Sequence, residues 1–305
     1  MISGQKKIHE YSPMTQIRVT GEDAFTFLQG QFTNELRQPT GSAIYGLWLN
    51  HKGKVVADSH VLRLAENEFF LASATSPAAV IRPRLEAYIV ADDVTLRDET
   101  ATVRGLALSG PGCGEAIKQV LGEAPGAGRF VRNGGVLIFP GRRSRAENYE
   151  IIGAEKIITE LRNRLVAQDW VEAGAAAMEL ARISAGQPGI PEDLGPGDLP
   201  NEGGLEESAI SYTKGCYLGQ EVMARLRNMG KVRRRLHVVR GDGVPPRRPA
   251  LLYQGEKKVG EIRSSANNGD EFVALAMLSL INLDQGAGLS LSPSEPPSLT
   301  IDLHG

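Results

Sequence analysis

The stretch ISYTKGCYLGQEVMARLRNMGK, residues 210–231, combines a strand-like run, a tight turn and a helical pattern. Residues 210–213 favour a β-strand, and Gly215 is expected to adopt a positive φ in the turn that follows. From residue 219 to residue 229, apolar side chains recur at the spacing of one helical face, and Gly230 is a candidate C-cap. This order predicts a strand, a turn and a helix.

Cys216 is expected where this turn meets the start of the helix. A helix N-terminus carries unpaired N–H groups and a partial positive charge, and Lys214 adds a full charge nearby. Both effects favour the thiolate, so the pKa of the Cys216 thiol is expected to fall below its ordinary value if solvent reaches it. The alternative is a small apolar side chain buried under a turn, which is the commoner state of a free cysteine.

The segment KGCYLGQEVMAR resembles the signature of the YgfZ branch of the YgfZ/GcvT superfamily. The residues that match this signature are Lys214, Gly215, Cys216, Tyr217, Gly219, Gln220, Glu221 and Arg225. The resemblance extends over nearly the whole chain. It implies a folate-binding protein that is linked to iron–sulfur cluster assembly or repair and to tRNA modification.

The resemblance also implies an α+β fold of the aminomethyltransferase type. Ferredoxin-like units would surround a central channel, followed by a C-terminal β-barrel. We expect residues 1–231 to form the folate-binding region, built from two interleaved subdomains. Residues 232–305 are expected to form the barrel, with a flexible Pro/Ser-rich tail.

By the same resemblance, the motif residues form the reactive set at the rim of the folate cleft. Cys216 would trap a sulfur, an iron or a redox partner, and Lys214 would hold the thiolate charge. Gln220 would donate to the sulfur or to the ligand. Glu221 and Arg225 are four residues apart, so they are expected to pair and fix the helix.

Glu202 is the first choice for holding the pterin ring of tetrahydrofolate or a folate derivative. It lies in a Pro-x-Glu segment that the family places before its signature. A carboxylate can accept two parallel hydrogen bonds from the 2-amino group and ring N–H of a pterin. The alternative is that Glu202 caps or solvates a loop, as glutamates commonly do.

The remaining folate-binding candidates also rest on the resemblance. Arg182 belongs to an Arg-x-x-x-Gly pattern, and Gln31 and Asn34 lie in the block that leads into the folate channel. Met14 and Met178 occupy positions where bacterial relatives tend to place tryptophans, and a methionine sulfur can pack against a ring face.

Composition limits the classes of function. Lys and Arg number 34 and Asp and Glu 36, so the net charge of −2 gives no general attraction to nucleic acid. The 41% hydrophobic content is that of a globular protein, and no run of 18 apolar residues predicts a membrane span. The N-terminus shows no targeting pattern, and two distant cysteines, Cys113 and Cys216, fit a reducing compartment, so we expect a cytoplasmic protein.

Two cysteines cannot supply the four thiolates that a [4Fe–4S] cluster normally takes. We therefore predict no resident metal site and a helper role toward iron–sulfur proteins or cluster-assembly factors. Cys113 follows a glycine-rich turn, SGPGCG, which we interpret as structural because it lacks the residues of a phosphate-binding loop.

Three functions remain open on the sequence. The first is a folate-dependent accessory factor with little or no catalysis. The second is a folate-dependent aminomethyl or methyl transferase, in which Asp58 would assist proton movement. The third is a tRNA-binding module that uses the basic segment 225–248, in which nine Lys and Arg accompany one Asp.

Overall fold

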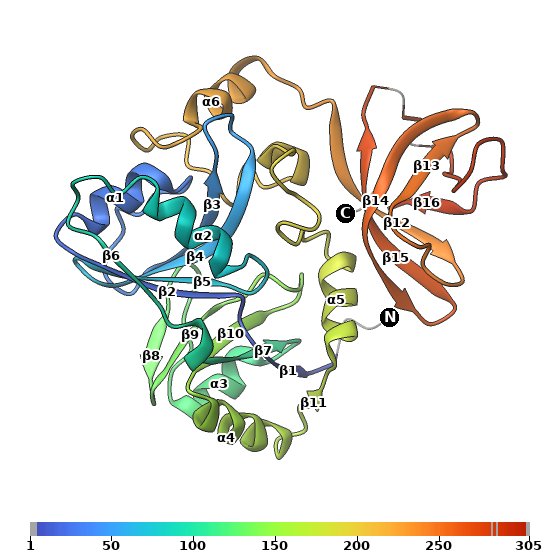
Figure 1. The fold of residues 1–305 in the computed structure, drawn as a ribbon. Coiled ribbons are helices and arrows are strands. Elements are labelled where there is room, and N and C mark those ends of the chain that lie inside the picture. Colours follow the sequence, from blue (N-terminus) through green and yellow to red (C-terminus); the bar gives the residue numbers. More distant parts are fainter. Residues whose placement is uncertain (1–4, 282, 285, 303–305) are drawn as a thin grey trace.

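The computed structural model describes residues 5–281, 283–284 and 286–302. Two β-sheets lie face to face, each covered on its outer side by a pair of helices, and a third sheet forms the C-terminal part of the molecule (Figure 1). Hydrophobic clusters fill the space between each sheet and its helices, and a smaller cluster lies between the two sheets. The predicted α+β fold is confirmed.

The first sheet follows the order β3-β4-β5-β2-β6, and its paired strands are antiparallel. Its strands are predicted closely by period-two alternation, and Gly53, at φ +68, allows the tight turn between β3 and β4. Its elements are β2 (Thr15–Thr20), α1 (Ala24–Gln31), β3 (Ala43–Leu49), β4 (Val55–Ala65), β5 (Glu68–Ser73), α2 (Ala78–Glu86) and β6 (Thr95–Asp98).

The second sheet repeats this succession of strand, helix, three strands, helix and strand. Its order is β11-β1-β7-β10-β9-β8, so β1 is inserted between the two strands that would otherwise be neighbours. A short 3₁₀ turn, η1 (Thr100–Thr102), precedes it. Its elements are β1 (Lys7–Tyr11), β7 (Arg104–Ser109), α3 (Cys113–Leu121), β8 (Val131–Asn133), β9 (Val136–Pro140), β10 (Asn148–Gly153), α4 (Glu155–Val166) and β11 (Val171–Glu172).

A long segment with few regular elements joins the two sheets to the C-terminal part. It contains α5 (Ala175–Ser184), η2 (Pro200–Gly203) and α6 (Gln220–Met229). The strand predicted for residues 210–213 does not form. Instead, this segment is bound to the loop that follows α1. Ser211 N–H donates to Thr33 O, and Thr33 Oγ1 donates to Ala209 O.

The C-terminal sheet runs in the order β13-β14-β15-β12-β16. Leu289 and Ser290 form isolated bridges to Leu299 and Tyr253 of its two outer strands, so the sheet curls into a half-barrel of the predicted type. Its strands are β12 (Arg234–Asp242), β13 (Ala250–Gln254), β14 (Lys257–Asn268), β15 (Glu271–Ser279) and β16 (Leu299–Ile301).

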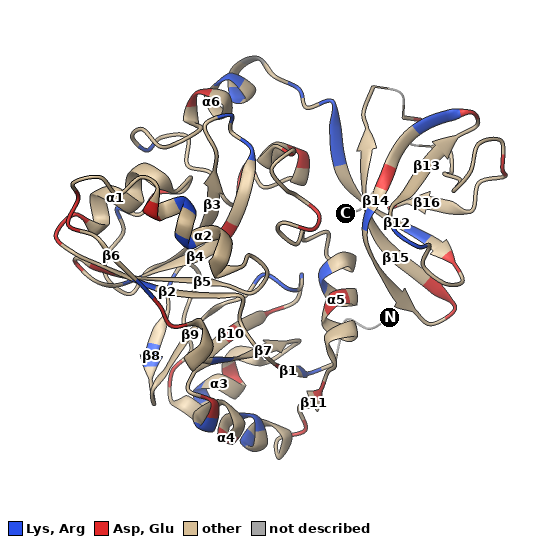
Figure 2. Ribbon diagram, viewed as in Figure 1, with Lys and Arg blue, Asp and Glu red and all other residues tan. Residues whose placement is uncertain are grey.

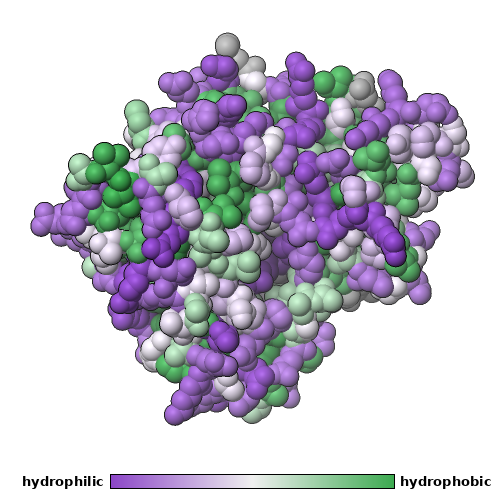
Figure 3. All heavy atoms as spheres, in the orientation of Figure 1, coloured by the Kyte–Doolittle hydropathy of each residue, from purple (hydrophilic) through white to green (hydrophobic). Residues whose placement is uncertain are grey.

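The flexible tail stays a prediction; within it, Leu299–Ile301 form β16 and pair with β12. The domain boundary at 231/232 stays a prediction, with β12 beginning at Arg234. No helix among the described residues is long and apolar enough to cross a membrane. In the view of Figure 3 the surface is mainly hydrophilic, with hydrophobic side chains gathered over α1.

Candidate functional site

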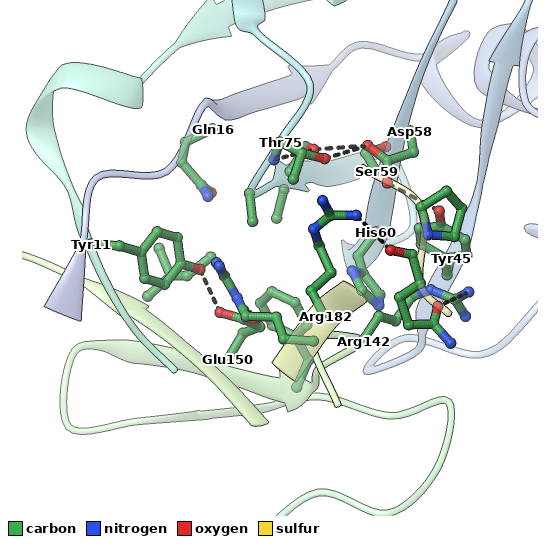
Figure 4. A pocket seen from close by; sticks show the side chains of 18 residues that line it. Tyr11, Gln16, Tyr45, Asp58, Ser59, His60, Thr75, Arg142, Glu150 and Arg182 are labelled. Atoms are coloured by element: carbon green, nitrogen blue, oxygen red, sulfur yellow. Dashed lines mark hydrogen bonds and ion pairs between the residues drawn. The ribbon is translucent and has the colours of Figure 1, made fainter. Parts of the chain in front are cut away.

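A cavity lies between the two facing sheets, and the start of the loop after α5 closes one side of it (Figure 4). Its empty volume is about 630 Å³, including its opening to solvent. Strands β2, β3, β4 and β5 of the first sheet and β1, β9 and β10 of the second contribute to the wall. The polar side chains that line it include Tyr11, Gln16, Tyr45, Asp58, Ser59, His60, Ser73, Thr75, Arg142, Arg143, Glu150, Arg182 and Gln187.

Asp58, in the middle of β4, is one of two buried carboxylates in this cavity. Four hydroxyls point at it: Ser76 Oγ at 2.6 Å, Ser73 Oγ and Tyr45 OH at 3.0 Å, and Thr75 Oγ1 at 3.4 Å. Burial, and then the Asp58 charge, raise the pKa of Tyr45 well above its ordinary value, so this hydroxyl remains a donor. Three of these hydroxyls point at Oδ1 and the Tyr45 hydroxyl at Oδ2, so the protein satisfies Oδ1 fully and Oδ2 keeps room for one more donor.

Glu150, on β10, is the second buried carboxylate. Its Oε2 accepts from Tyr11 OH at 2.5 Å, and its Oε1 accepts from Arg143 Nε at 2.6 Å. The Arg143 guanidinium also lies over the Tyr11 ring, 4.1 Å from its centroid. Each Glu150 oxygen thus has one partner from the protein and retains capacity to accept a second hydrogen bond.

Three ring side chains in contact with one another form another wall of the cavity. His60 lies between Tyr45 and Phe139, with centroid separations of 5.3 and 4.9 Å, and the Arg142 guanidinium lies 3.8 Å from the Tyr45 centroid. Burial, and then the Arg142 charge, lower the pKa of His60 to about 3. His60 is therefore neutral at physiological pH and presents a flat, uncharged face.

The motif loop lies outside this cavity. Cys216 is exposed, and it is not one of the residues that line the cavity. Helix α6 begins at Gln220, four residues after Cys216, and the residue with positive φ is Gly219, at +88°, instead of Gly215. The predicted place of Cys216 at the head of a helix is therefore wrong, because the chain needs residues 217–219 to turn into α6.

Lys214 does not hold a thiolate charge as predicted. Its ammonium is buried and donates to three backbone carbonyls at the end of α1, Gln29 O at 2.8 Å, Phe32 O at 2.7 Å and Asn34 O at 2.8 Å. These bonds use all three of its protons. Burial lowers the pKa of Lys214 to about 8. Lys214 thus fastens the motif loop to the first sheet.

Asn34 connects this anchor to the cavity. Its carbonyl accepts from Lys214, and its side-chain Nδ2 donates to Tyr45 O at 2.9 Å. Tyr45 in turn lines the cavity and donates to Asp58. A continuous path of contacts therefore runs from the loop that carries Cys216 to the wall of the cavity.

Comparison with known proteins agrees with this architecture. The family model of the GCVT N-terminal domain matches residues 3–214. The iron–sulfur cluster assembly factor IBA57, mitochondrial, of Homo sapiens is 30% identical over 92% of this chain and 82% of its own length. This chain belongs to the YgfZ/GcvT superfamily.

Other members of the superfamily differ in their names. An aminomethyltransferase of Corynebacterium jeikeium is 23% identical over 98% of this chain and 84% of its own, and the tRNA-modifying protein YgfZ of Colwellia psychrerythraea is 27% identical over 83% and 76%. The crystal structure of the glycine cleavage system aminomethyltransferase T from Bartonella henselae superposes with a TM-score of 0.84 at 20% identity, covering 99% of this chain and 86% of that one. That likeness shows the shared fold.

Of the folate-binding candidates drawn from the superfamily, Arg182 alone lines the cavity. It forms ion pairs with Glu179 and, at 2.6 Å, with Asp193, and it donates to Gln187 O at 2.6 Å. Its charge is therefore balanced within the protein, and it holds the loop that closes the cavity. We could expect its position from sequence, but not these partners.

Glu202 is not in the cavity, which corrects the prediction for it. One oxygen accepts from Leu199 N–H at 2.7 Å, and the other pairs with Arg234 Nε at 2.8 Å. The Pro-x-Glu segment forms the short helix η2, so its carboxylate turns back on its own first turn and toward β12. Glu202 thus joins the central segment to the barrel, and Glu150 is the glutamate that the cavity contains.

The other candidates do not line the cavity. Met178 is buried in α5, Met14 is 43% exposed, and Gln31 accepts from Arg84 Nη1 at 2.5 Å. Glu221 and Arg225 are both exposed, and they form no ion pair with each other in the described part of the chain. Met14 and Met178, which occupy the positions compared with tryptophans above, therefore offer no surface to a ring in this cavity.

The basic segment 225–248 is partly neutralised. Its positive residues lie on α6, on the linker after it and on β12 (Figure 2). Arg234, Arg235, Arg240 and Arg248 form ion pairs with acidic residues. Nucleic-acid binding there stays a prediction. Among the described residues, no group of three His, Cys, Asp or Glu is arranged to hold a metal ion.

Proposed function

We propose that this protein is a tetrahydrofolate-binding accessory factor for iron–sulfur cluster assembly or repair, and through it for tRNA modification. The relatives named as an iron–sulfur cluster assembly factor and as a tRNA-modifying protein support this role. The observation that carries the proposal is the separation of two sites, a polar cavity inside the fold and an exposed Cys216 outside it, joined through Lys214 and Asn34.

Glu150 is the residue that we propose for the pterin ring. A pterin edge offers two adjacent donors, the 2-amino group and a ring N–H, which suit a carboxylate with one free position on each oxygen. Glu150 meets this requirement, whereas three hydroxyls crowd Oδ1 of Asp58 and leave a free position on its Oδ2 alone. His60 and Tyr45 supply flat faces against which the ring can pack. Bound folate would supply a carrier for one-carbon units.

Cys216 is the residue that we propose for contact with iron–sulfur partners. Because it is exposed and outside the cavity, its thiol faces a second protein instead of the folate. The anchor at Lys214 fixes the loop that presents it, and Gln220, Glu221 and Arg225 lie on the adjoining helix, where a partner would touch them. A cytoplasmic location stays part of this proposal; the human relative is named as mitochondrial.

Two variants test the proposal in cells that lack the protein. We expect Cys216→Ser to fail to restore iron–sulfur enzyme activity and Cys113→Ser to restore it. In calorimetry, the wild type is expected to bind tetrahydrofolate, and Glu150→Gln to bind at least tenfold more weakly, because a neutral amide replaces one acceptor by a donor. Full rescue by Cys216→Ser, or no folate binding by wild type, contradicts the proposal.

A second candidate function is folate-dependent aminomethyl or methyl transfer. The hydroxyl network around Asp58 favours it, since a fixed, buried carboxylate beside a folate ring can accept or return a proton. The aminomethyltransferases among the relatives also support it. Transfer of a one-carbon unit to tetrahydrofolate by wild type, lost in Asp58→Asn with folate affinity kept, would favour this function over the accessory role.

A further inference from the structure

Gln16 has a side chain with no partner in the protein, in the wall of the cavity. The residue is fully buried, and neither its Oε1 nor its Nε2 forms a hydrogen bond with the protein. Figure 4 shows its carboxamide end turned toward the cavity. A primary amide offers two donors and two acceptor positions, so Gln16 brings a complete and unused hydrogen-bonding group to this site.

The backbone around Gln16 is held by hydrogen bonds on both sides. The lack of partners for its side chain is therefore not caused by disorder of the strand. Gln16 pairs with Ala72 of β5, its N–H donates to Thr100 Oγ1 at 2.9 Å, and its carbonyl accepts from Glu99 N–H at 2.7 Å. Its neighbours Thr15 and Ile17 point to the opposite face of the sheet. A single position on β2 therefore presents an amide to the layer between the sheets.

Beside the polar side chains that line the cavity, that layer contains an apolar cluster. The cluster between the sheets contains Leu62, Phe70, Ala72, Phe139 and Ile152. A buried amide without partners is destabilising in such surroundings, and nearly all buried polar groups in folded proteins are paired. Hydrophobic packing alone would favour an apolar residue at position 16, so the presence of glutamine needs another reason.

A second unused donor lies in the same cavity. Arg143 Nη2 is buried without a partner, although Arg143 Nε is bound to Glu150. The other buried groups without partners, such as Asn201 Oδ1 and His237 Nε2, do not line this cavity. The cavity therefore contains two groups without partners. One is the Gln16 amide, and the other is an N–H of Arg143, which is bound to the carboxylate assigned to the pterin.

We propose that Gln16 is a specificity residue that recognises the lactam edge of the bound ring, a carbonyl next to an N–H. Gln16 Nε2 donates to the ring carbonyl, the neighbouring ring N–H is the one that Glu150 accepts, and Arg143 Nη2 donates to a further acceptor of the ring. The inference rests on the proposed folate binding, because the pterin of tetrahydrofolate carries such an edge. Flavins and guanine carry the same edge and are the competing sources.

The decisive experiment compares wild type with Gln16→Met, which keeps the length of the side chain and removes its polar atoms. Calorimetry and thermal unfolding are measured with tetrahydrofolate, FMN and GTP as separate probes. Asn201→Leu is the control, because it also removes a buried polar atom without a partner but lies outside the cavity.

We expect Gln16→Met to weaken binding of tetrahydrofolate about 10-fold to 100-fold, because the buried ring carbonyl is left without its donor. Without ligand, the same variant is expected to unfold about 2 to 4 °C higher than wild type, because an unpaired amide is no longer buried. The control is expected to keep wild-type affinity. If Gln16 only fills space, Gln16→Met will change neither the affinity for tetrahydrofolate nor the stabilisation that the ligand gives.

The outcomes separate this inference from the proposed function. If wild type and Gln16→Met bind tetrahydrofolate equally, Gln16 is not a specificity residue and the folate proposal stands. If wild type binds FMN or GTP in place of tetrahydrofolate, and Gln16→Met does not, the lactam pairing stands and the folate proposal fails. If wild type binds none of the three, both are wrong.

Discussion

Cys113 and Cys216 both follow a glycine in a turn that leads toward a helix, yet the fold treats them in opposite ways. Cys113 is the first residue of α3, but it is fully buried, and burial raises the pKa of its thiol to about 12. Cys216 precedes its helix by four residues and is exposed. A helix end is worth only about 0.3–1 kcal/mol, so burial decides the state of Cys113 and the helix does not.

The largest expected difference between the two segments is in their reaction with iodoacetamide. At pH 8 only about one in 10⁴ Cys113 thiols is ionised, and the residue is closed to the reagent. We expect Cys216 to be alkylated at least a thousandfold faster, as measured by mass spectrometry of the native protein. In urea both should react at similar rates. Comparable native rates would mean that exposure does not separate the two residues.

The lysines of the two segments give the next test. Lys214→Met leaves three carbonyls at the end of α1 without their donor, and we expect it to lower the free energy of unfolding by roughly 3 kcal/mol. Lys118→Met, in the helix of Cys113, removes an exposed pair with Glu115 and should leave stability unchanged within error. Denaturation in urea measures both. Equal effects would show that the anchor is not structural.

Two glycines of the motif sharpen the contrast within the Cys216 segment. At Gly219, φ is +88° and an added Cβ would lie 2.9 Å from Asn50 O, so Gly219→Ala is expected to cost about 1–2 kcal/mol. At Gly215, φ is ordinary and nothing lies within 4 Å of an added Cβ, so Gly215→Ala should change stability by less than about 0.5 kcal/mol. Thermal unfolding checks the order. The reverse order would restore the turn predicted at residue 215.

The smallest effect is a pH dependence. Between the ordinary thiol pKa of 9.0 and about 12, folded Cys113 keeps its proton while the unfolded chain loses it, so stability falls as pH rises through this range. From pH 8 to pH 10, Cys113→Ala is therefore expected to lose about 1 kcal/mol less stability than wild type. Identical slopes for the two proteins would contradict the assignment.

Much of the fold could be predicted from sequence, because β2 alternates apolar and polar residues, β5 is a short apolar run, and the turn signal Asn133-Gly134-Gly135 separates β8 from β9. The strand β1 was missed, since KIHEY carries little hydrophobic signal and is stabilised by pairing with β7 on one side and β11 on the other. Such pairing joins residues more than 90 positions apart, which no local pattern reports.

The site was predicted less well than the fold. The motif around Cys216 stood out as a continuous string, but Glu150, Gln16 and Tyr11 come from three strands that meet only when the sheets pack face to face. Glu202 was chosen because it lies near the motif in sequence, whereas its partner Arg234 could be found only from tertiary contacts. An acidic residue in the middle of an apolar strand, as in NYEII, is the signal that would have pointed to Glu150.

The insertion of β1 into the second sheet has a consequence for how the molecule comes apart. The chain forms β1 in one sheet and then crosses to build the whole of the other before it returns at β7. The second half cannot be excised as one continuous stretch of chain, because its strand β1, which lies between β7 and β11, precedes the whole of the first half in sequence. The two halves should therefore melt in one cooperative transition, and a protease cut between β1 and β2 should loosen the half that lies farther along the chain.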